Sequence, residues 1–347
     1  GRTPRPSPRR RRSCRRSRCA PVFEALSALS DGVLESVSSD ESGLLWIAGY
    51  THDREPGVYR LYDHATGESR ELFRGHPHLD PADLAPMDAV SFTARDGLPL
   101  HGFLTLPVGT TRQDTERLPL VLVVHGGPWA HDAWGYDPEV QFLANRGYAV
   151  LQVNFRGSPG YGRRHLTAAI GELAGAMHDD LIDACDWAVG QGWADPDRIG
   201  IYGGSYGGYA ALAGVTLQQG LYRCAVAVAP VSDIRAMYNE DYRESGDRRI
   251  TKEALLQQLG PRDRWDDVSP RRNADRADAP ILLIHGREDT VVPYSHSTQM
   301  ADKLKDNGKP YELVSLDGED HWLSLSATRQ QMLEATMRFV QEHNPAD

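Results

Sequence analysis

From residue 89 to the C-terminus, the chain alternates continuous apolar runs with amphipathic stretches. "AVSFTA" and "LHGFLTLP" flank the turn sequence Arg95-Asp96-Gly97 and predict an antiparallel hairpin. The later runs are typical of strands covered on both faces: LPLVLVVHGG, YAVLQVNFRG, RIGIYGG, CAVAVAP, APILLIHG and YELVSLDG. Helical patterns lie between or after these runs, at 178–191, 207–218, 296–307 and 327–342. Together they predict an α/β fold, in which helices cover a mostly parallel, eight-stranded sheet.

A different pattern occupies residues 33–74, where four short β-like runs are separated by turn sequences such as Ser42-Gly43 and Pro56-Gly57. Four strands in about 42 residues are typical of one blade of a β-propeller. No second copy of the pattern occurs. The segment is therefore either the remnant of a larger propeller or an ordinary antiparallel extension of the next domain.

Composition divides the chain further. Residues 1–20 contain nine arginines and no acidic residue, and they predict a disordered basic tail. Residues 21–88 hold the β segment and a Pro-rich linker, and residues 89–347 hold the α/β domain. Beyond the tail, 48 acidic residues outnumber 29 basic ones, which argues against nucleic acid as a partner.

Other sequence features exclude several classes of site. No apolar run approaches the roughly 18 residues of a membrane span, so no membrane partner is expected. No HExxH or Walker motif occurs, and neither a metal nor a cofactor is expected. Cys14 and Cys19 lie in the tail, while Cys185 and Cys224 lie in apolar segments and are predicted to be buried thiols. This cysteine usage favours a cytoplasmic location.

The stretch "RIGIYGGSYGGYAAL" (198–212) concentrates glycine around a single serine, between a predicted strand and a predicted helix. A strand that turns directly into a helix bends sharply, and small neighbours leave room for that bend. The pattern Gly203-x-Ser205-x-Gly207 therefore predicts a nucleophile elbow with the hydroxyl of Ser205 at its tip.

A serine nucleophile needs a base and a group that orients the base. Asp289 follows the strand "ILLIHG", and His321 follows the strand "YELVSL", in the order serine, acid, histidine. All three side chains then come from the C-terminal ends of strands, where open α/β sheets bind ligands. Glu288 remains an alternative acid.

The other candidate residues are less suited to these roles. Asp317 and Asp320 precede His321 too closely to orient its ring. Four other histidines have structural or solvent-exposed interpretations: we expect satisfied core positions for His125 and His285, and solvated positions for His131 and His296.

Acyl transfer also requires donors for the oxyanion of the tetrahedral intermediate. The backbone N–H of Tyr206 follows the nucleophile directly. The loop "HGGPW" (125–129) resembles the HGGG-type loop of esterases, and Gly127 has an N–H to offer there, whereas Pro128 has none.

Five ordered motifs, HGGPWA, LQVNFRGSPGYG, GGSYGGYA, DTVVPYSHS and GEDHW, resemble the prolyl oligopeptidase family of serine peptidases. The nearest branch is similar to acylaminoacyl-peptidases and dipeptidyl peptidases. The resemblance implies an α/β-hydrolase domain preceded by a β-propeller, of which the four-stranded segment would be the last blade. It also implies Ser205 as nucleophile, Asp289 as acid, His321 as base, and Gly127 and Tyr206 as oxyanion donors.

The resemblance further implies a P1 pocket lined by Val231, Ile234 and Val292. The sequence departs from the family where Val291 replaces a common Arg or Asn, where "LAGAM" replaces a Trp-Gly pair, and in having a single blade. We therefore expect hydrolysis of short or N-acylated peptides, with a carboxylesterase on small acyl esters and a non-catalytic fragment as alternatives. Either solvent or a second subunit of a homo-oligomer would lie over the opening left by the missing blades.

Overall fold

The computed structural model describes residues 16–113, 117–244 and 249–346. The chain divides into two compact units, Gly1–Asp83 and Leu84–Asp347. The division lies a few residues before the one predicted at 88/89, because Ala85 and Met87 already pack in the core of the larger unit. Ala85 also exchanges two backbone hydrogen bonds with the side chain of Gln141, at 2.9 and 2.8 Å.

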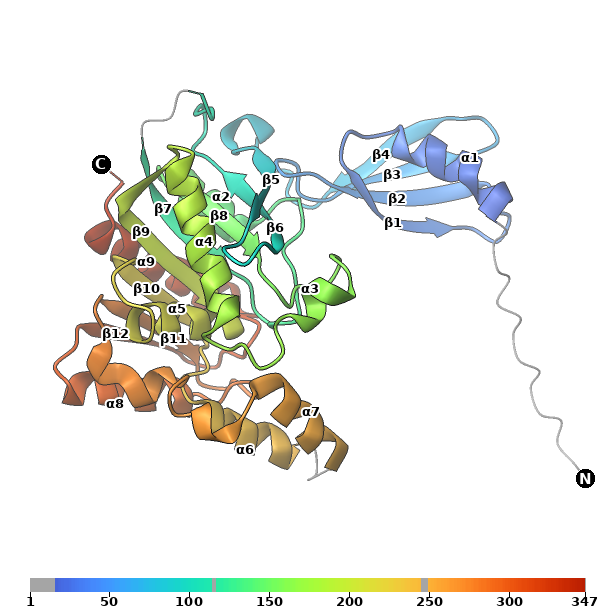
Figure 1. Ribbon diagram of the computed structural model, residues 1–347. Helices are drawn as coiled ribbons and strands as arrows, with labels where there is room; N and C mark the ends of the chain where they lie inside the picture. Colours follow the sequence, from blue (N-terminus) through green and yellow to red (C-terminus); the bar gives the residue numbers. More distant parts are fainter. Residues whose placement is uncertain (1–15, 114–116, 245–248, 347) are drawn as a thin grey trace, which may run out of the picture. The chain divides into compact units, whose positions relative to one another are not determined.

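The smaller unit is a four-stranded antiparallel sheet in the order β1-β2-β3-β4. Its strands are β1 (Val33–Ser39), β2 (Leu45–Thr51), β3 (Val58–Asp63) and β4 (Ser69–Arg74), and η1 (Pro81–Asp83) follows them (Figure 1). These strands match the four β-like runs of the sequence. Their interpretation as a propeller blade stays a prediction.

Helix α1 (Arg16–Ser27) covers one face of this sheet. Leu26 packs against the sheet residues Ala48, Tyr50 and Tyr62, and the Tyr50 hydroxyl donates a 2.6 Å hydrogen bond to the Leu26 carbonyl. Residues 16–20 were expected in a disordered tail, and the structure instead places them in this helix, which the buried Leu26 anchors to the sheet. Residues 1–15 of the expected tail lie outside the described residues.

The larger unit contains an eight-stranded sheet in the order β12-β11-β10-β9-β7-β8-β6-β5. The hairpin strands β5 and β6 are antiparallel, β6 is antiparallel to β8, and the remaining pairs are parallel. The sequence prediction of a mostly parallel sheet is confirmed. The strands are β5 (Met87–Thr93), β6 (Pro99–Thr105), β7 (Leu118–Val124), β8 (Ala149–Asn154), β9 (Ala194–Gly204), β10 (Cys224–Val228), β11 (Ile281–Gly286) and β12 (Tyr311–Leu316).

Helices cover both faces of this sheet, which gives the unit two hydrophobic cores (Figure 1). One core contains residues from α4 (Ala176–Gly190), α5 (Tyr206–Thr216) and α8 (Ser295–Asp306). The other contains residues from α2 (Pro138–Ala144) and α9 (Ser326–His343). The predicted helices are present with small shifts at their ends.

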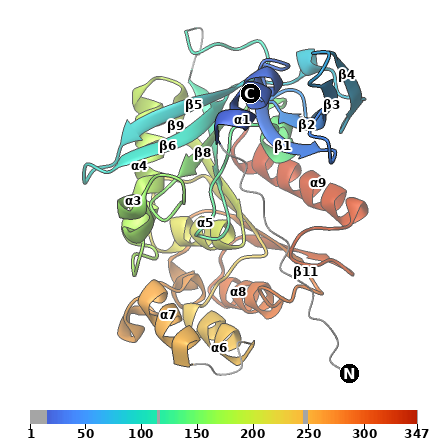
Figure 2. The ribbon, with the colours of Figure 1, turned by 90° about the vertical axis from the view of Figure 1, so that its right-hand side faces the viewer.

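The sequence patterns did not single out α2, nor three further helices, α3 (Arg163–Thr167), α6 (Ile234–Glu244) and α7 (Arg249–Leu259). Helices α6 and α7 lie side by side (Figure 2), and the short helices η2 (Arg262–Arg264) and η3 (Pro270–Arg276) follow them. None of the helices among the described residues is long and apolar enough to cross a membrane.

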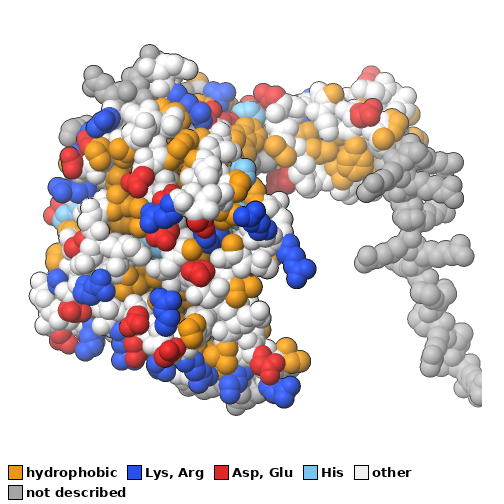
Figure 3. All heavy atoms as spheres, in the orientation of Figure 1, with side chains coloured by type: hydrophobic (Ala, Val, Ile, Leu, Met, Phe, Trp, Pro, Cys, Tyr) orange, Lys and Arg blue, Asp and Glu red, His pale blue; other side chains and the backbone are white. Residues whose placement is uncertain are grey.

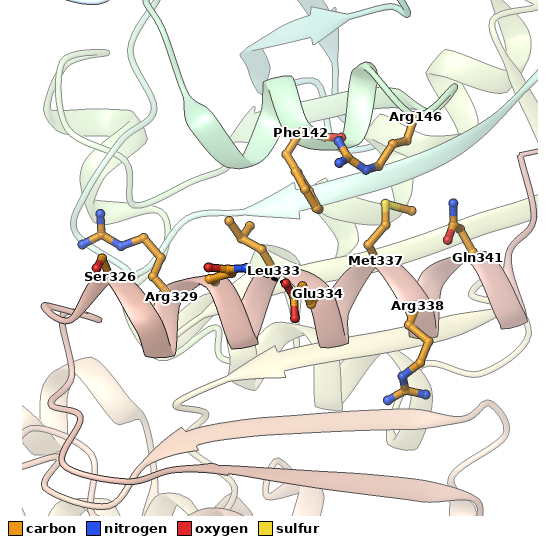
Figure 4. A pocket seen from close by; sticks show the side chains of 10 residues that line it. Phe142, Arg146, Ser326, Arg329, Leu333, Glu334, Met337, Arg338 and Gln341 are labelled. Atoms are coloured by element: carbon orange, nitrogen blue, oxygen red, sulfur yellow. Dashed lines mark hydrogen bonds between the residues drawn. The ribbon is translucent and has the colours of Figure 1, made fainter. Parts of the chain in front are cut away.

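Helices α2 and α9 face each other across a surface groove of about 650 Å³ (Figure 4). Phe142 of α2 points toward Leu333 and Met337 of α9, and the Arg146 guanidinium lies 3.6 Å from the centre of the Phe142 ring. None of the site residues predicted from the sequence lines this groove.

Candidate active site

Ser205 stands between the last residue of β9 and the first residue of α5, as the elbow pattern predicts. Its backbone has φ 57° and ψ −116°, a conformation that non-glycine residues rarely adopt. Two backbone hydrogen bonds hold it there. The Ser205 N–H donates to the Val228 carbonyl at 2.9 Å, and the Ser205 carbonyl accepts from the Tyr209 N–H at 3.0 Å.

The glycines beside Ser205 are required by close backbone contacts. A Cβ atom on Gly203 would lie 2.5 Å from the carbonyl carbon of Gly207, and a Cβ on Gly207 would lie 2.0 Å from the Val124 oxygen. Both distances are too short for any side chain. Glycine at these positions therefore lets the first turn of α5 pack directly against the ends of β7 and β9.

The loop ends that carry the predicted triad meet at one edge of the sheet. Strands β9, β10, β11 and β12 are adjacent and parallel, so their C-terminal ends share that edge. Backbone hydrogen bonds join these ends in series: Ser205 to Val228, Ala229 to Ile284 at 2.7 Å, and Arg287 to Leu316 at 3.0 Å. Ser205 directly follows β9, and Asp289 and His321 lie in the loops that follow β11 and β12.

Asp289 and His321 are in direct contact. Nδ1 of His321 lies 2.7 Å from Oδ2 of Asp289, whose side chain is fully buried. The other oxygen, Oδ1, accepts hydrogen bonds from the backbone N–H groups of Val291 and Val292, both at 2.8 Å. Because Nδ1 is engaged in this way, Nε2 is the nitrogen left to exchange a proton with a serine.

Hydrogen bonding keeps the Asp289 carboxyl ionised. Burial alone would raise its pKa, but hydrogen bonds from His285, from His321 and from the Val292 N–H outweigh burial and hold the pKa well below its usual range. The alternative acid, Glu288, is exposed. The other nearby carboxylates bond elsewhere: Asp317 pairs with Arg287, and Asp320 accepts from Ser324.

The loop that carries His321 is held by Glu319, a residue that the sequence patterns did not single out. The Glu319 side chain is fully buried and accepts hydrogen bonds from the backbone N–H groups of Asp320, Ser324 and Leu325, and from the hydroxyl of Thr328. The only sequence feature that could have indicated this is an acidic residue between a strand and the helix start at Ser326.

The histidines outside the triad differ in how well their positions were predicted. His131 is exposed, as expected. The expectation that His296 is solvated is wrong: it is 3% exposed, its Nε2 lies 3.0 Å from Glu240, and its Nδ1 accepts from the Ser232 N–H at 3.1 Å. A position at a helix start does not reveal that α6 packs over it. His125 contacts Ser158 through Nε2 at 2.9 Å, and burial lowers its pKa to about 4.

The predicted oxyanion loop lies against the elbow. A Cβ on Gly126 would meet the Ser205 Cβ at 3.4 Å, so the two segments are in van der Waals range. Gly127 has φ +118°, and a Cβ there would lie 2.6 Å from the Trp129 nitrogen, so the loop conformation requires glycine. Tyr206 is the first residue of α5, where backbone N–H groups have no partner within the helix.

The three residues predicted to line the P1 pocket have different environments. Val231 is half-buried, whereas Ile234, at the start of α6, and Val292 are almost fully buried. Val292 is tied to Asp289 by its N–H. The structure thus brings Val292 next to the predicted acid, and the pocket itself remains a prediction.

Comparisons with known proteins agree with this geometry. A family model described as the prolyl oligopeptidase family matches residues 134–345. Dipeptidyl aminopeptidase BIII of Pseudoxanthomonas mexicana is 37% identical over 306 residues, which are 86% of this chain and 44% of that protein. Dipeptidyl peptidase family member 6 of Caenorhabditis elegans is 29% identical over 318 residues, which are 84% of this chain and 42% of that protein.

Among solved structures, a puromycin-hydrolyzing peptidase of Mycobacterium tuberculosis has a TM-score of 0.80 and 29% identity, over 90% of this chain and 47% of that one. The chain spans less than half the length of each of these three proteins. The larger unit has the α/β-hydrolase fold expected from the sequence. Because the family model matches more than half of the sequence, the chain belongs to the prolyl oligopeptidase family.

Proposed function

We propose that the protein is a serine hydrolase that cleaves short or N-acylated peptides through an acyl-enzyme on Ser205. The observation that carries this proposal is the 2.7 Å contact between His321 Nδ1 and the buried Asp289, at the same sheet edge as a strained serine elbow. Family membership supports the same chemistry.

Each residue then has a defined role. Nε2 of His321 accepts the hydroxyl proton while Ser205 Oγ attacks the carbonyl carbon, and Asp289 stabilises the imidazolium that forms. The N–H groups of Gly127 and Tyr206 stabilise the oxyanion. His321 returns its proton to the leaving amine as the C–N bond breaks. Water, activated by the same imidazole, then releases the acyl group and restores the serine.

We infer the substrate preference from the residues that are predicted to line the P1 pocket. Val231, Ile234 and Val292 would form an aliphatic P1 wall, so we expect an apolar residue there rather than Lys or Arg. A carboxylesterase activity is the second candidate, because Val291, two residues after the acid, is 41% exposed and offers no polar group to a peptide.

The cellular setting is also a proposal. Cys185 and Cys224 are free, buried thiols, as predicted, and this supports a reducing, cytoplasmic environment. The proposed partners are the small peptide or ester substrate and, in a homo-oligomer, a second copy of this chain.

Substitution combined with active-site labelling tests the proposal. The wild-type protein should react with a fluorophosphonate and hydrolyse an acyl-amino-acid anilide, and Ser205→Ala should abolish labelling and reduce kcat by about 10⁶. Asp289→Asn should reduce kcat by about 10⁴, because the imidazole would take the wrong tautomer.

Glu288→Gln is the matched control for the acid and should retain near wild-type activity. If Ser205→Ala keeps more than about a tenth of the activity, or if Glu288→Gln is the more damaging change, the assignment is wrong. Rates on a p-nitrophenyl ester, measured beside those on the anilide, separate the peptidase from the esterase.

A further inference from the structure

A second imidazole contacts the proposed catalytic acid. His285, in β11, is completely buried, and its Nε2 lies 3.2 Å from Oδ2 of Asp289. The same nitrogen lies 2.8 Å from the Val292 carbonyl oxygen, and Nδ1 lies 2.7 Å from the hydroxyl oxygen of Ser297 in α8. His285 therefore bridges the strand end, the acid loop and α8.

The neighbours of His285 determine its protonation pattern. Nε2 faces two oxygen acceptors and must carry a proton to satisfy either of them. Nδ1 faces a hydroxyl group, which can donate to it. A ring with its proton on Nε2 and none on Nδ1 thus satisfies all three contacts.

This contact completes the hydrogen bonding of the Asp289 carboxylate. Oδ1 accepts from the N–H groups of Val291 and Val292, and Oδ2 accepts from His321. Oδ2 also lies 3.2 Å from Nε2 of His285, whose proton it shares with the Val292 carbonyl oxygen at 2.8 Å. Donors on both oxygens prevent the carboxylate from rotating about its Cβ–Cγ bond. Without His285, Oδ2 would keep only the hydrogen bond from His321, the group that Asp289 has to orient.

The surroundings of His285 argue against a direct part in proton transfer. Its ring meets Tyr294 edge to face, with centroids 5.7 Å apart. Asp289 is the carboxylate within contact distance of the ring. His285 has no solvent exposure, and the member of the predicted triad that it contacts is Asp289 rather than the proton-transferring ring of His321.

We propose that His285 is a positioning residue, which holds Oδ2 of Asp289 in place so that the carboxylate stays aligned with His321 during the reaction. The proposal rests on the serine hydrolase function proposed above. It assigns to His285 a task beyond the core position that the sequence pattern indicates.

Substitutions at position 285 test this role through the split between kcat and KM. His285→Leu removes the donor, and kcat should fall about 10- to 100-fold, as expected for the loss of a hydrogen bond to a charged group, while KM changes less than about twofold. His285→Gln places an amide nitrogen near the position of Nε2 and should recover most of this loss. Tyr294→Phe is the matched control, because it changes a neighbour of the same ring that does not contact Asp289.

A spectroscopic measurement tests the proposal without using activity. The His321 Nδ1 proton should give a low-field proton resonance, and His285→Leu should shift it upfield, because a carboxylate that is no longer held at Oδ2 makes a longer hydrogen bond to Nδ1. A merely structural role of His285 would leave this resonance in place. If His285→Leu does not fold, Ser297→Ala is the second variant, since it frees Nδ1 and should lower kcat about threefold or more.

The outcomes separate the two proposals. Unchanged kcat and an unchanged resonance in a folded His285→Leu or Ser297→Ala protein overturn the positioning role, even if Ser205 is confirmed as the nucleophile. Failure of the wild-type protein to react with the fluorophosphonate overturns the hydrolase function instead, and the resonance shift then still decides whether His285 acts on Asp289. A His285→Gln protein as impaired as His285→Leu also contradicts the proposal.

Discussion

The two sheets of the molecule differ in how they are covered. In the eight-stranded sheet, β8, β10 and β11 are buried along their whole length, between two helix layers. In the four-stranded sheet, α1 covers one face, while Leu45, Ile47 and Phe73 on the opposite face are 42%, 43% and 56% exposed. Hydrophobic side chains are visible on the surface of this smaller unit in Figure 3.

The more tightly packed sheet should tolerate fewer substitutions than the sheet with an open face. All candidate site residues lie in the larger unit, where the backbone of the elbow approaches β7 so closely that only glycine fits. The smaller unit has one core, built from one helix and one sheet face. We therefore expect substitutions to have large effects where both faces are covered and small effects on the face that is open.

The largest effect is expected at Gly207. In Gly207→Ala the new Cβ would meet the Val124 oxygen at 2.0 Å, and this backbone atom cannot move unless α5 separates from β7. Overpacking of this kind should cost about 3 kcal/mol of unfolding free energy and displace Ser205, with fluorophosphonate labelling slowed more than about 100-fold. Urea unfolding and labelling kinetics measure both effects.

Gly190→Ala is the matched control for that substitution. Gly190 ends α4 in the same unit, and a Cβ there meets nothing within 4 Å. Alanine should be neutral or stabilising by about 0.5 kcal/mol. Equal stability losses in the two variants would show that close approach at the elbow is not what requires glycine.

Much of the fold and the outline of the site could be predicted because the relevant information is local. Continuous apolar runs mark buried strands, and the glycines around Ser205 mark a tight strand-to-helix turn. Asp289 and His321 could be placed because both follow parallel strands. Their contact then depends only on neighbouring strand ends.

What could not be predicted depends on packing between distant segments. His285 contacts Asp289 because the turn after β11 folds back on the strand. Its ring also contacts the hydroxyl of Ser297, which comes from the separate helix α8. His296 is buried because α6 lies over it, and the polar sequence of α6 gives no sign of that contact. Glu319 stabilises a loop through four donors that follow it in sequence but are brought together only by the turn.

A smaller effect is expected at Asp132, in the segment after the oxyanion loop. Burial, aided by repulsion from Asp137, raises its pKa from 3.8 to about 7, against a hydrogen bond from Gln152. The folded protein therefore keeps a proton between about pH 4 and pH 7 that the unfolded chain releases, so stability falls as pH rises through that window and levels off above it.

Asp132→Asn has no such proton to lose. The stability of this variant relative to wild type should therefore grow between pH 4 and pH 7, by about 1–2 kcal/mol once partial solvent exposure is allowed for. Urea unfolding at pH 4, 5.5, 7 and 8 measures this difference. A difference that stays constant over the series would mean that the carboxyl of Asp132 titrates alike in the folded and unfolded states.

The smallest effect is expected on the open face of the four-stranded sheet, at Ile47. Its neighbours on β1 and β3 are Ser38 and Leu61, and its side chain is 43% exposed. The substitution Ile47→Thr therefore removes little apolar contact. Threonine also keeps the β-branched shape that strands favour. We expect the free energy of unfolding to change by about 0.5 kcal/mol or less, as measured by hydrogen exchange of peptides from residues 45–63.

Leu26→Ala, on the covered face of the same sheet, is the comparison. It should lower the free energy of unfolding by about 2–3 kcal/mol, because Leu26 is fully buried. A loss at Ile47 as large as that at Leu26 would mean that a further layer covers this face in solution, and the contrast between the two sheets would then not hold.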